Sequence, residues 1–346
     1  MTLVSPSMCV DSVLGIDVAK AKVDTWFERV TPSQKPTHQR YDTTPAGHQR
    51  LLAWLASQAV GQLHACLEAT GTYSDALALC LHQAGYRVSL VNPLRIKRYG
   101  ESELRRIKTD KSDAALIARF CLTQQPDPWT PLPPEQRELQ DLVRSLQDVK
   151  HLSQQQVSRQ QSGPHTPTVA QTTTCILTCL QEQRKTLETQ ITHHILAHKS
   201  LATDYALLLS IVSIGPKTAA VLLAELGDVR RFANVRDVVA YVGLCPRLCS
   251  SGSSLHGPTP LTKRGNAVVR KALYFPALNA LRFNPCLRPF YHRLLAQGKP
   301  KMVAVAAVMR KLLHLVYGVL CSGCPFDPAH VSLPPAPASS QDPLAH

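Results

Sequence analysis

The sequence predicts an α/β domain over residues 1–127 and a mainly helical remainder. Up to about residue 125, short apolar segments alternate with segments of helical spacing, a pattern typical of layered α/β domains. The proline-rich stretch DPWTPLPPEQ, which begins at Asp127, marks a boundary. Beyond it, the apolar residues recur mainly at three- and four-residue steps, which predicts helices.

The first domain can be followed segment by segment. VLGI at 13–16 and the VAKAKVDTWFE segment after Asp17 predict two strands joined by a tight turn. Gly85 is a plausible helix end, and Pro93 is expected to stop a strand. The further helices are expected at 46–57 and 72–84, and the further strands at 63–70 and 87–93.

The remainder divides into three parts. Two apolar-periodic arms within 128–205 predict a helical hairpin or coiled coil, which suits dimerisation, although a plain helical spacer fits almost as well. A C-terminal domain is expected over 206–328. Its segment 207–228 reads as helix, glycine turn and helix, so that backbone N–H groups and Lys217 could hold a phosphate, whereas the simpler alternative is an αα-turn. The tail at 329–346 is expected to be disordered.

Charge narrows the classes of partner. The chain carries 38 Lys and Arg against 24 Asp and Glu, a formal charge of +14, which favours a polyanion. Clustering of the basic residues favours nucleic acid over a membrane surface. The apolar window 302–321 is interrupted by Arg310, Lys311 and His314, which favours a buried or amphipathic helix. With no recognisable signal peptide and eleven cysteines, reduced thiols in a cytoplasmic location are expected.

Four acidic residues are candidates for chemistry. Asp17 and Glu68 each stand at the end of an expected strand, where α/β sheets place their sites. Asp110 and Asp113 stand three apart at an expected helix start and so share a face, although helix capping would explain either one alone. Four carboxylates beside a phosphate-binding surface suit two Mg²⁺ ions that clamp a phosphodiester.

That surface is expected from the segment 95–111, which holds seven Lys and Arg residues. The candidate nucleic-acid contacts within it are Arg105, Arg106, Lys108 and Lys111. A competing interpretation takes GIDVAK as the phosphate loop of an actin-like or sugar-kinase-like ATPase. It is weaker, because Val18-Ala19-Lys20 stands where such a loop has Gly and Thr or Ser.

A serine-rich segment, RLCSSGSSLHGP at 247–258, is open to two interpretations. It is either a slack loop or a loop that presents one hydroxyl to a substrate. The chain is basic and carries four candidate carboxylates elsewhere in the sequence. These features favour the interpretation that the loop presents one hydroxyl to a substrate.

The ordered set GIDVAK, CLEATGTY, KTDKSDA, SIGPKTAAVLL, YVGLCP, SGSS and TKRGNAVVRKALY resembles the DEDD-type insertion-sequence transposases. This is insertion-sequence family one-hundred-and-ten, to which a pilin-inversion recombinase is related, and the likeness runs from about residue 13 to 328. It implies an RNase H-like N-terminal domain of the RuvC resolvase type. In that domain Asp17, Glu68, Asp110 and Asp113 would bind Mg²⁺.

The resemblance also implies roles for the serine segment and for partners. Ser251 would be the nucleophile that forms a covalent phosphoserine–DNA intermediate. The family pattern further implies DNA element ends and target as substrates, a guide RNA encoded by the element, and dimers that assemble into tetramers. The sequence departs from that pattern at Ser250 and His256. The candidate phosphate contacts around the segment are Arg247, Ser253, Ser254, Lys263 and Arg264.

Two further functions stay open. A Mg²⁺-dependent junction nuclease would need the four acids and not Ser251. A catalytically inactive remnant would bind nucleic acid without cutting it.

Overall fold

The computed structural model describes residues 10–31, 35–69, 71–103, 109–163, 166–246, 250–251, 255–256, 261–262 and 264–330. The chain forms two compact units, Met1–Pro131 and Leu132–His346. The tail predicted as disordered from residue 329 begins in a 3-10 turn, Pro328–His330, and its residues from 331 onward lie outside the described residues.

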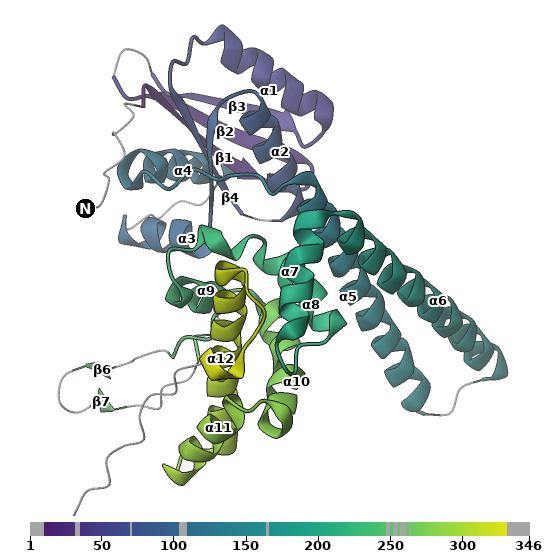
Figure 1. Ribbon diagram of the computed structural model, residues 1–346. Helices are drawn as coiled ribbons and strands as arrows, with labels where there is room; N and C mark the ends of the chain where they lie inside the picture. The colour runs from purple at the N-terminus through teal and green to yellow at the C-terminus, as the bar shows by residue number, and fades with distance from the viewer. Residues whose placement is uncertain are drawn as a thin grey trace, which may run out of the picture. The chain divides into compact units, whose positions relative to one another are not determined.

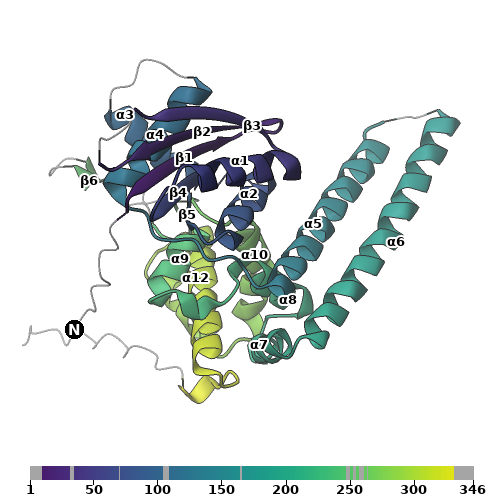
Figure 2. The same cartoon turned by 90° about the horizontal axis from the view of Figure 1, so that it is seen from above.

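The first unit is built on a five-stranded sheet in the order β3-β2-β1-β4-β5 (Figures 1 and 2). Strand β2 runs antiparallel to both its neighbours, whereas β1, β4 and β5 are parallel. The strands are β1 (Ser12–Val18), β2 (Lys22–Arg29), β3 (Thr37–Asp42), β4 (Leu63–Glu68) and β5 (Arg87–Val91). Four of the five were predicted, and β3 was not.

Helices cover both faces of this sheet (Figure 2). On one face, α1 (Pro45–Ser57) and α2 (Thr72–Gln83) bury Leu14 and Ile16 of β1. On the other, α4 (Asp110–Gln124) packs on β1, β2 and β4 and buries Val13 and Cys66, and α3 (Pro93–Ser102) lies beside α4. Pro93 ends the strand as predicted, but it also opens α3, which the sequence did not predict.

A glycine sets how closely α4 approaches the sheet. A Cβ on Gly15 of β1 would lie 2.2 Å from the Ala114 carbonyl oxygen and 2.2 Å from the Ala118 nitrogen. Any larger residue would therefore push α4 off the strand. The backbone of β1 thus fixes the height of the helix whose first turn carries Asp110 and Asp113.

The second unit is helical, as predicted. Its long hairpin of α5 (Pro134–Gln161) and α6 (Pro167–Ala197) is followed by α7 (Lys199–Ser210) and α8 (Pro216–Leu226), which form the expected helix–turn–helix. The remaining elements are the 3-10 turn η1 (Val229–Arg231), α9 (Val235–Val242), β6 (Ser250–Ser251), β7 (Leu255–His256), α10 (Ala267–Phe283), α11 (Leu287–Ala296), α12 (Lys301–Ser322) and the 3-10 turn η2 (Pro328–His330).

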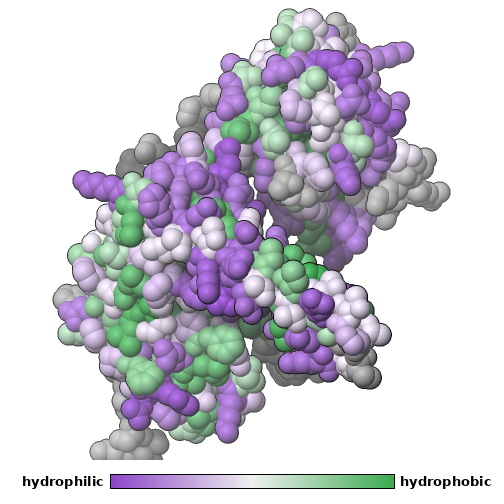
Figure 3. Space-filling view, turned by 90° about the vertical axis from the view of Figure 1, so that its right-hand side faces the viewer, coloured by the Kyte–Doolittle hydropathy of each residue, from purple (hydrophilic) through white to green (hydrophobic). Residues whose placement is uncertain are grey.

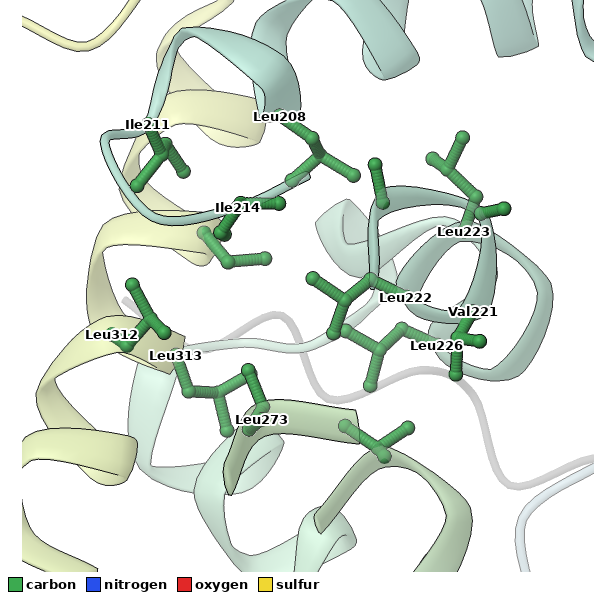
Figure 4. Packing of buried hydrophobic residues seen from close by; sticks show 14 of the residues in the cluster. Leu208, Ile211, Ile214, Val221, Leu222, Leu223, Leu226, Leu273, Leu312 and Leu313 are labelled. Atoms are coloured by element: carbon green, nitrogen blue, oxygen red, sulfur yellow. The ribbon is translucent and has the colours of Figure 1, made fainter. Parts of the chain in front are cut away.

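The core of this unit forms where α7, α8, α10 and α12 meet. Figure 4 shows Leu222 and Leu226 of α8 with Leu273 of α10 and Leu313 of α12. Helix α12 is long and apolar enough to cross a membrane by length and composition alone, yet half of that apolar window is buried inside the protein. It is therefore a core helix of this unit.

The surface carries both hydrophilic and hydrophobic residues. On the face shown in Figure 3, hydrophilic and hydrophobic side chains are interspersed. The most exposed large apolar side chains of the second unit include Phe275 and Phe283 of α10.

Candidate active site and nucleic-acid interface

Two of the predicted acids stand at the ends of neighbouring parallel strands. Asp17 is the sixth residue of β1 and Glu68 is the last residue of β4, and Ile16 lies opposite Leu67 in the register. Because side chains alternate along a strand, Asp17 projects from the same face as Gly15, the face covered by α4. The structure therefore brings Asp17 and Glu68 to one edge of the sheet.

The other two acids open α4, and they do not cap it. Thr109 is the N-cap: its hydroxyl oxygen accepts from the Ser112 nitrogen at 3.2 Å, and the Ser112 hydroxyl accepts from the Thr109 nitrogen at 2.9 Å. This reciprocal capping box satisfies two of the backbone N–H groups at the helix terminus. The N-cap role thus belongs to Thr109, while Asp110 and Asp113 stand in the first turn, where the helix dipole also favours negative charge.

Electrostatics shows that the acids act on one another. The pKa of Asp17 is raised above its ordinary value, first by burial and then by the negative charges of Asp113, Asp110 and Asp24. Lys22 opposes this shift. The end of β1 and the start of α4 therefore share one region of negative potential.

Two residues of this region were missed by sequence reasoning. Lys22, the first residue of β2, forms an ion pair with Asp110 and holds the pKa of that carboxyl below its ordinary value. Asp24 lies opposite Asp17 in the register and is 1% exposed. Its Oδ1 lies 2.8 Å from His38 Nε2 and 3.1 Å from Arg40 Nε. The tight turn after Asp17 was the available signal, because hairpin pairing places Asp24 beside it.

The donor chemistry fits a hard cation. Carboxylate oxygens are the ligands that Mg²⁺ prefers. Burial is the first cause of the raised pKa of Asp17, and the neighbouring carboxylates of Asp113, Asp110 and Asp24 add to it. Within the described part of the chain, however, no three His, Cys, Asp or Glu side chains are already grouped to hold a metal ion.

The basic segment beside the acids is only partly described. Arg105, Arg106 and Lys108 lie outside the described residues. The Lys111 ammonium, in the first turn of α4, lies 5.9 Å from the centroid of the Trp26 ring. Lys111 is therefore on the same face of the sheet as the acids.

The serine segment forms a short hairpin. Ser251 of β6 lies opposite Leu255 of β7, and Ser250 lies opposite His256. The residues Arg247, Ser253, Ser254 and Lys263 lie outside the described residues. Arg264 is described and exposed. The acids belong to the first unit and Ser251 to the second.

The base of this hairpin is anchored to the end of α9. Pro246 and Leu261 form a β-bridge across it, and the Asn266 nitrogen donates to the Tyr241 carbonyl oxygen at 2.9 Å. A Cβ on Gly265, whose φ is +141°, would lie 2.3 Å from that same carbonyl oxygen. The residues that flank the serine segment, Pro246 on one side and Leu261 to Asn266 on the other, form the neck of this segment. This neck is thus held by direct backbone contact.

A buried glutamate supports the same neck. Glu225 of α8 is 4% exposed, and its carboxylate accepts from Arg144 Nε at 3.1 Å and from Asn266 Nδ2 at 2.7 Å. Asn266 in turn caps α10, accepting from the nitrogens of Val268 and Val269. Glu225 is therefore a positioning residue for the segment that follows the serines. Nothing in the local sequence distinguishes it from an exposed helix glutamate.

Lys217, predicted to hold a phosphate, has a protein partner. It stands in the first turn of α8, after the N-cap Gly215, and its Nζ lies 2.9 Å from Glu188 Oε1 of α6. Gly215, Pro216 and Lys217 are all exposed. The predicted turn is accessible, and its lysine is held in place by a carboxylate.

Two family models match the chain. Residues 14–162 match a model of DEDD transposases of the IS110 type, described as "Transposase". Residues 205–292 match the model described as "Transposase IS116/IS110/IS902 family". The first match contains all four acids.

Relatives match over most of the length. The pilin gene-inverting protein of Moraxella bovis is 32% identical over 318 residues, 91% of this chain and 97% of the relative. The counterpart in Moraxella lacunata is 31% identical over the same share, and the putative transposase y4qE of Sinorhizobium fredii is 26% identical over 89% of this chain and 88% of its own. The chain is thus an enzyme of the transposase and DNA recombinase class. It belongs to the IS110/IS116 family of transposases.

Proposed function

We propose that this transposase cuts and rejoins DNA through a covalent serine–DNA intermediate, with its four acids binding Mg²⁺. The sheet order, with β2 as the antiparallel strand, supports an RNase H-like fold of the RuvC type for the first unit. The observation that carries the proposal is the shared negative region of Asp17, Asp110 and Asp113, next to the strand end at Glu68.

Each acid has a part in this proposal. Asp17 and Glu68 project from rigid strand ends, and Asp110 and Asp113 from a helix whose N-cap is another residue. When bound there, Mg²⁺ would polarise the scissile phosphate and favour loss of the serine proton. Lys22 supplies positive charge to Asp110 in the protein alone, which limits repulsion before a cation binds.

The bond changes balance in two steps. The Ser251 hydroxyl oxygen bonds to phosphorus while one ester bond of the strand breaks, and the departing strand oxygen takes up a proton as the serine loses one. A strand hydroxyl then attacks the phosphoserine, which re-forms a phosphodiester and returns the serine hydroxyl. No external energy source is needed, because each bond broken is replaced by a similar one.

The test is a denaturing gel with labelled DNA, run with and without Mg²⁺. Wild type should give a protein–DNA adduct that depends on Mg²⁺. Ser251→Ala should lose the adduct while binding DNA as before, and the neighbouring Ser250→Ala is the matched control that keeps it. Asp110→Asn should lose both cleavage and adduct.

The outcomes separate the three functions. An adduct that survives Ser251→Ala overturns the serine assignment. Mg²⁺-dependent cleavage without any adduct indicates the junction nuclease, and DNA binding without cleavage indicates an inactive remnant.

Further partners belong to the same proposal. We propose an element-encoded guide RNA that pairs with both DNAs, and dimers formed through the α5–α6 hairpin that assemble into tetramers on nucleoid DNA. The basic excess of the chain supports nucleic-acid partners. RNA that copurifies with the protein and is required for target cutting would support the guide. A protein that cuts its target after complete RNase treatment would contradict it.

A further inference from the structure

A cavity of about 180 Å³, open to solvent beside the exposed Lys217, lies in the second unit at the base of the α5–α6 hairpin. Helix α8 lines it with its first turn, and Tyr205 of α7 lines it as well. Its apolar wall is made by Val143, Leu146, Ile191, Ile195, Ala220 and Val221. The lining also contains two lysines and one glutamate from three different helices, so this polar edge is built by tertiary structure.

The cations at this cavity outnumber its carboxylate. Glu188 Oε1 lies 2.9 Å from Lys217 Nζ and 3.2 Å from Arg184 Nε. Lys150 of α5 also lines the cavity and is partly buried. Two lysines therefore line the cavity with one carboxylate, and that carboxylate is shared with Arg184 outside the lining.

Lys150 is compensated only at a distance, by the negative charge of Glu188. Among the described residues, no hydrogen bond or ion pair joins its ammonium to a partner. Burial lowers the pKa of Lys150, Lys217 and Arg184 lower it further, and Glu188 alone opposes them. Taking a cation out of water without a partner costs free energy, which a bound anion would recover.

The end of α8 adds to the attraction for an anion. Its first residue, Pro216, has no N–H, and the N-cap Gly215 provides no side-chain hydrogen bond, so the N–H groups that follow Pro216 are not satisfied by a cap. Those N–H groups and the helix dipole favour negative charge beside Lys217. The cavity therefore combines an anion-binding edge with an apolar wall.

We propose that this cavity binds a phosphodiester of a nucleic-acid backbone, with the adjoining sugar or base against the apolar wall. Lys150 and Lys217 contact the phosphate, and Glu188 holds Lys217 and Arg184 in position until the phosphate takes its place. The inference rests on the proposed function only in taking nucleic acid as the substrate. DNA and RNA share this chemistry, so both are probed.

The test measures equilibrium binding by the full chain at several salt concentrations. The probes are a labelled single-stranded DNA, its duplex, and a single-stranded RNA of the same sequence, read by fluorescence anisotropy. Lys150→Gln and Lys217→Gln should each weaken binding about fivefold to tenfold and lower the salt slope by about 1. Glu188→Gln should tighten binding, because it removes the competing carboxylate. The probe that shows these effects identifies DNA or RNA as the source.

Lys185→Gln is the matched control. It removes one positive charge from the same helix as Glu188, at an exposed position outside the cavity. Lys150→Arg keeps the charge and should bind nearly as wild type, so it separates lost charge from lost folding. Circular dichroism melts check that every variant is folded.

The inference is overturned if the two lysine variants bind all three probes as tightly, and with the same salt slope, as Lys185→Gln. It is also overturned if inorganic phosphate at equal concentration competes as well as the oligonucleotides, which indicates a general anion site. Neither result touches the proposed strand chemistry, because cleavage and adduct formation are scored separately with Asp110→Asn and Ser251→Ala.

Discussion

Replacing Gly15 by alanine should both destabilise the first unit and disable its acids. The new Cβ would lie 2.2 Å from two backbone atoms of α4, whereas ordinary van der Waals contact begins at about 3.4 Å. Helix α4 must therefore retreat by roughly 1 Å, because neither the Ala114 carbonyl nor the Ala118 nitrogen can rotate away. Overpacking of this kind costs about 1–3 kcal/mol of unfolding free energy.

The same movement separates the acids. Asp110 and Asp113 lie on the first turn of α4, whereas Asp17 lies on β1, two residues from the substitution. A displacement of about 1 Å in a reacting constellation costs on the order of 100-fold in rate. We expect Gly15→Ala to lose cleavage by about that factor even where it remains folded.

The assay is Mg²⁺-dependent cleavage of labelled DNA at a temperature well below the melting transition, together with a urea unfolding curve. Gly318→Ala is the control, since Gly318 lies in helix α12 with open space at its Cβ position. It should raise the unfolding free energy by about 0.5–1 kcal/mol and leave cleavage unchanged. A Gly15→Ala protein that unfolds and cleaves like wild type would refute the reasoning.

Asp17→Asn should raise the melting temperature at pH 7 without divalent cations, because burial, Asp113 and Asp110 raise the pKa of Asp17 and so make its ionised form destabilising. That gain should vanish as the pH falls below about 3.9, where Asp17 is protonated in both states, and melts at pH 7 and pH 3 check this sign. Mg²⁺ should raise the melting temperature of wild type more than that of Asp17→Asn; equal shifts would count against metal binding there. Glu225→Gln should cost about 1–3 kcal/mol in urea unfolding, since it weakens a buried acceptor of the half-exposed Arg144, and should reduce adduct formation. An unchanged unfolding curve would show that Glu225 does not support the neck.

Strands and helices with one buried face could be predicted, because their apolar residues recur at regular intervals in the sequence. The ends of β1 and β4 were located in this way, and with them Asp17 and Glu68. Strand β3, Thr37–Asp42, has no buried residue and no apolar alternation, since it is the edge of the sheet. Helix α3 buries only Ile96, so its apolar period is too short to recognise.

The polar contacts of the sites could not be predicted, because they depend on register and on distant segments. Lys22 contacts Asp110, which lies 88 residues further along the sequence, and Glu225 contacts Arg144, which lies 81 residues earlier. A glutamate near the end of a helix is usually solvated, and only the packing of α5 and α10 around α8 buries this one. Amino-acid composition does not predict contacts of this kind.

Both candidate sites are held by backbone contacts that only glycine permits. At Gly15 the main chain of α4 rests on β1, and at Gly265 the neck of the serine segment rests on the end of α9. Backbone atoms have no rotamers to adjust, so such contacts resist displacement better than side-chain packing does. This rigidity matters most in the first unit, where Asp17, Asp110 and Asp113 repel one another and Lys22 compensates only in part. Because the backbone cannot relax, the repulsion among the carboxylates persists in the protein without a bound metal ion. A divalent cation that binds there relieves this repulsion and therefore binds more tightly.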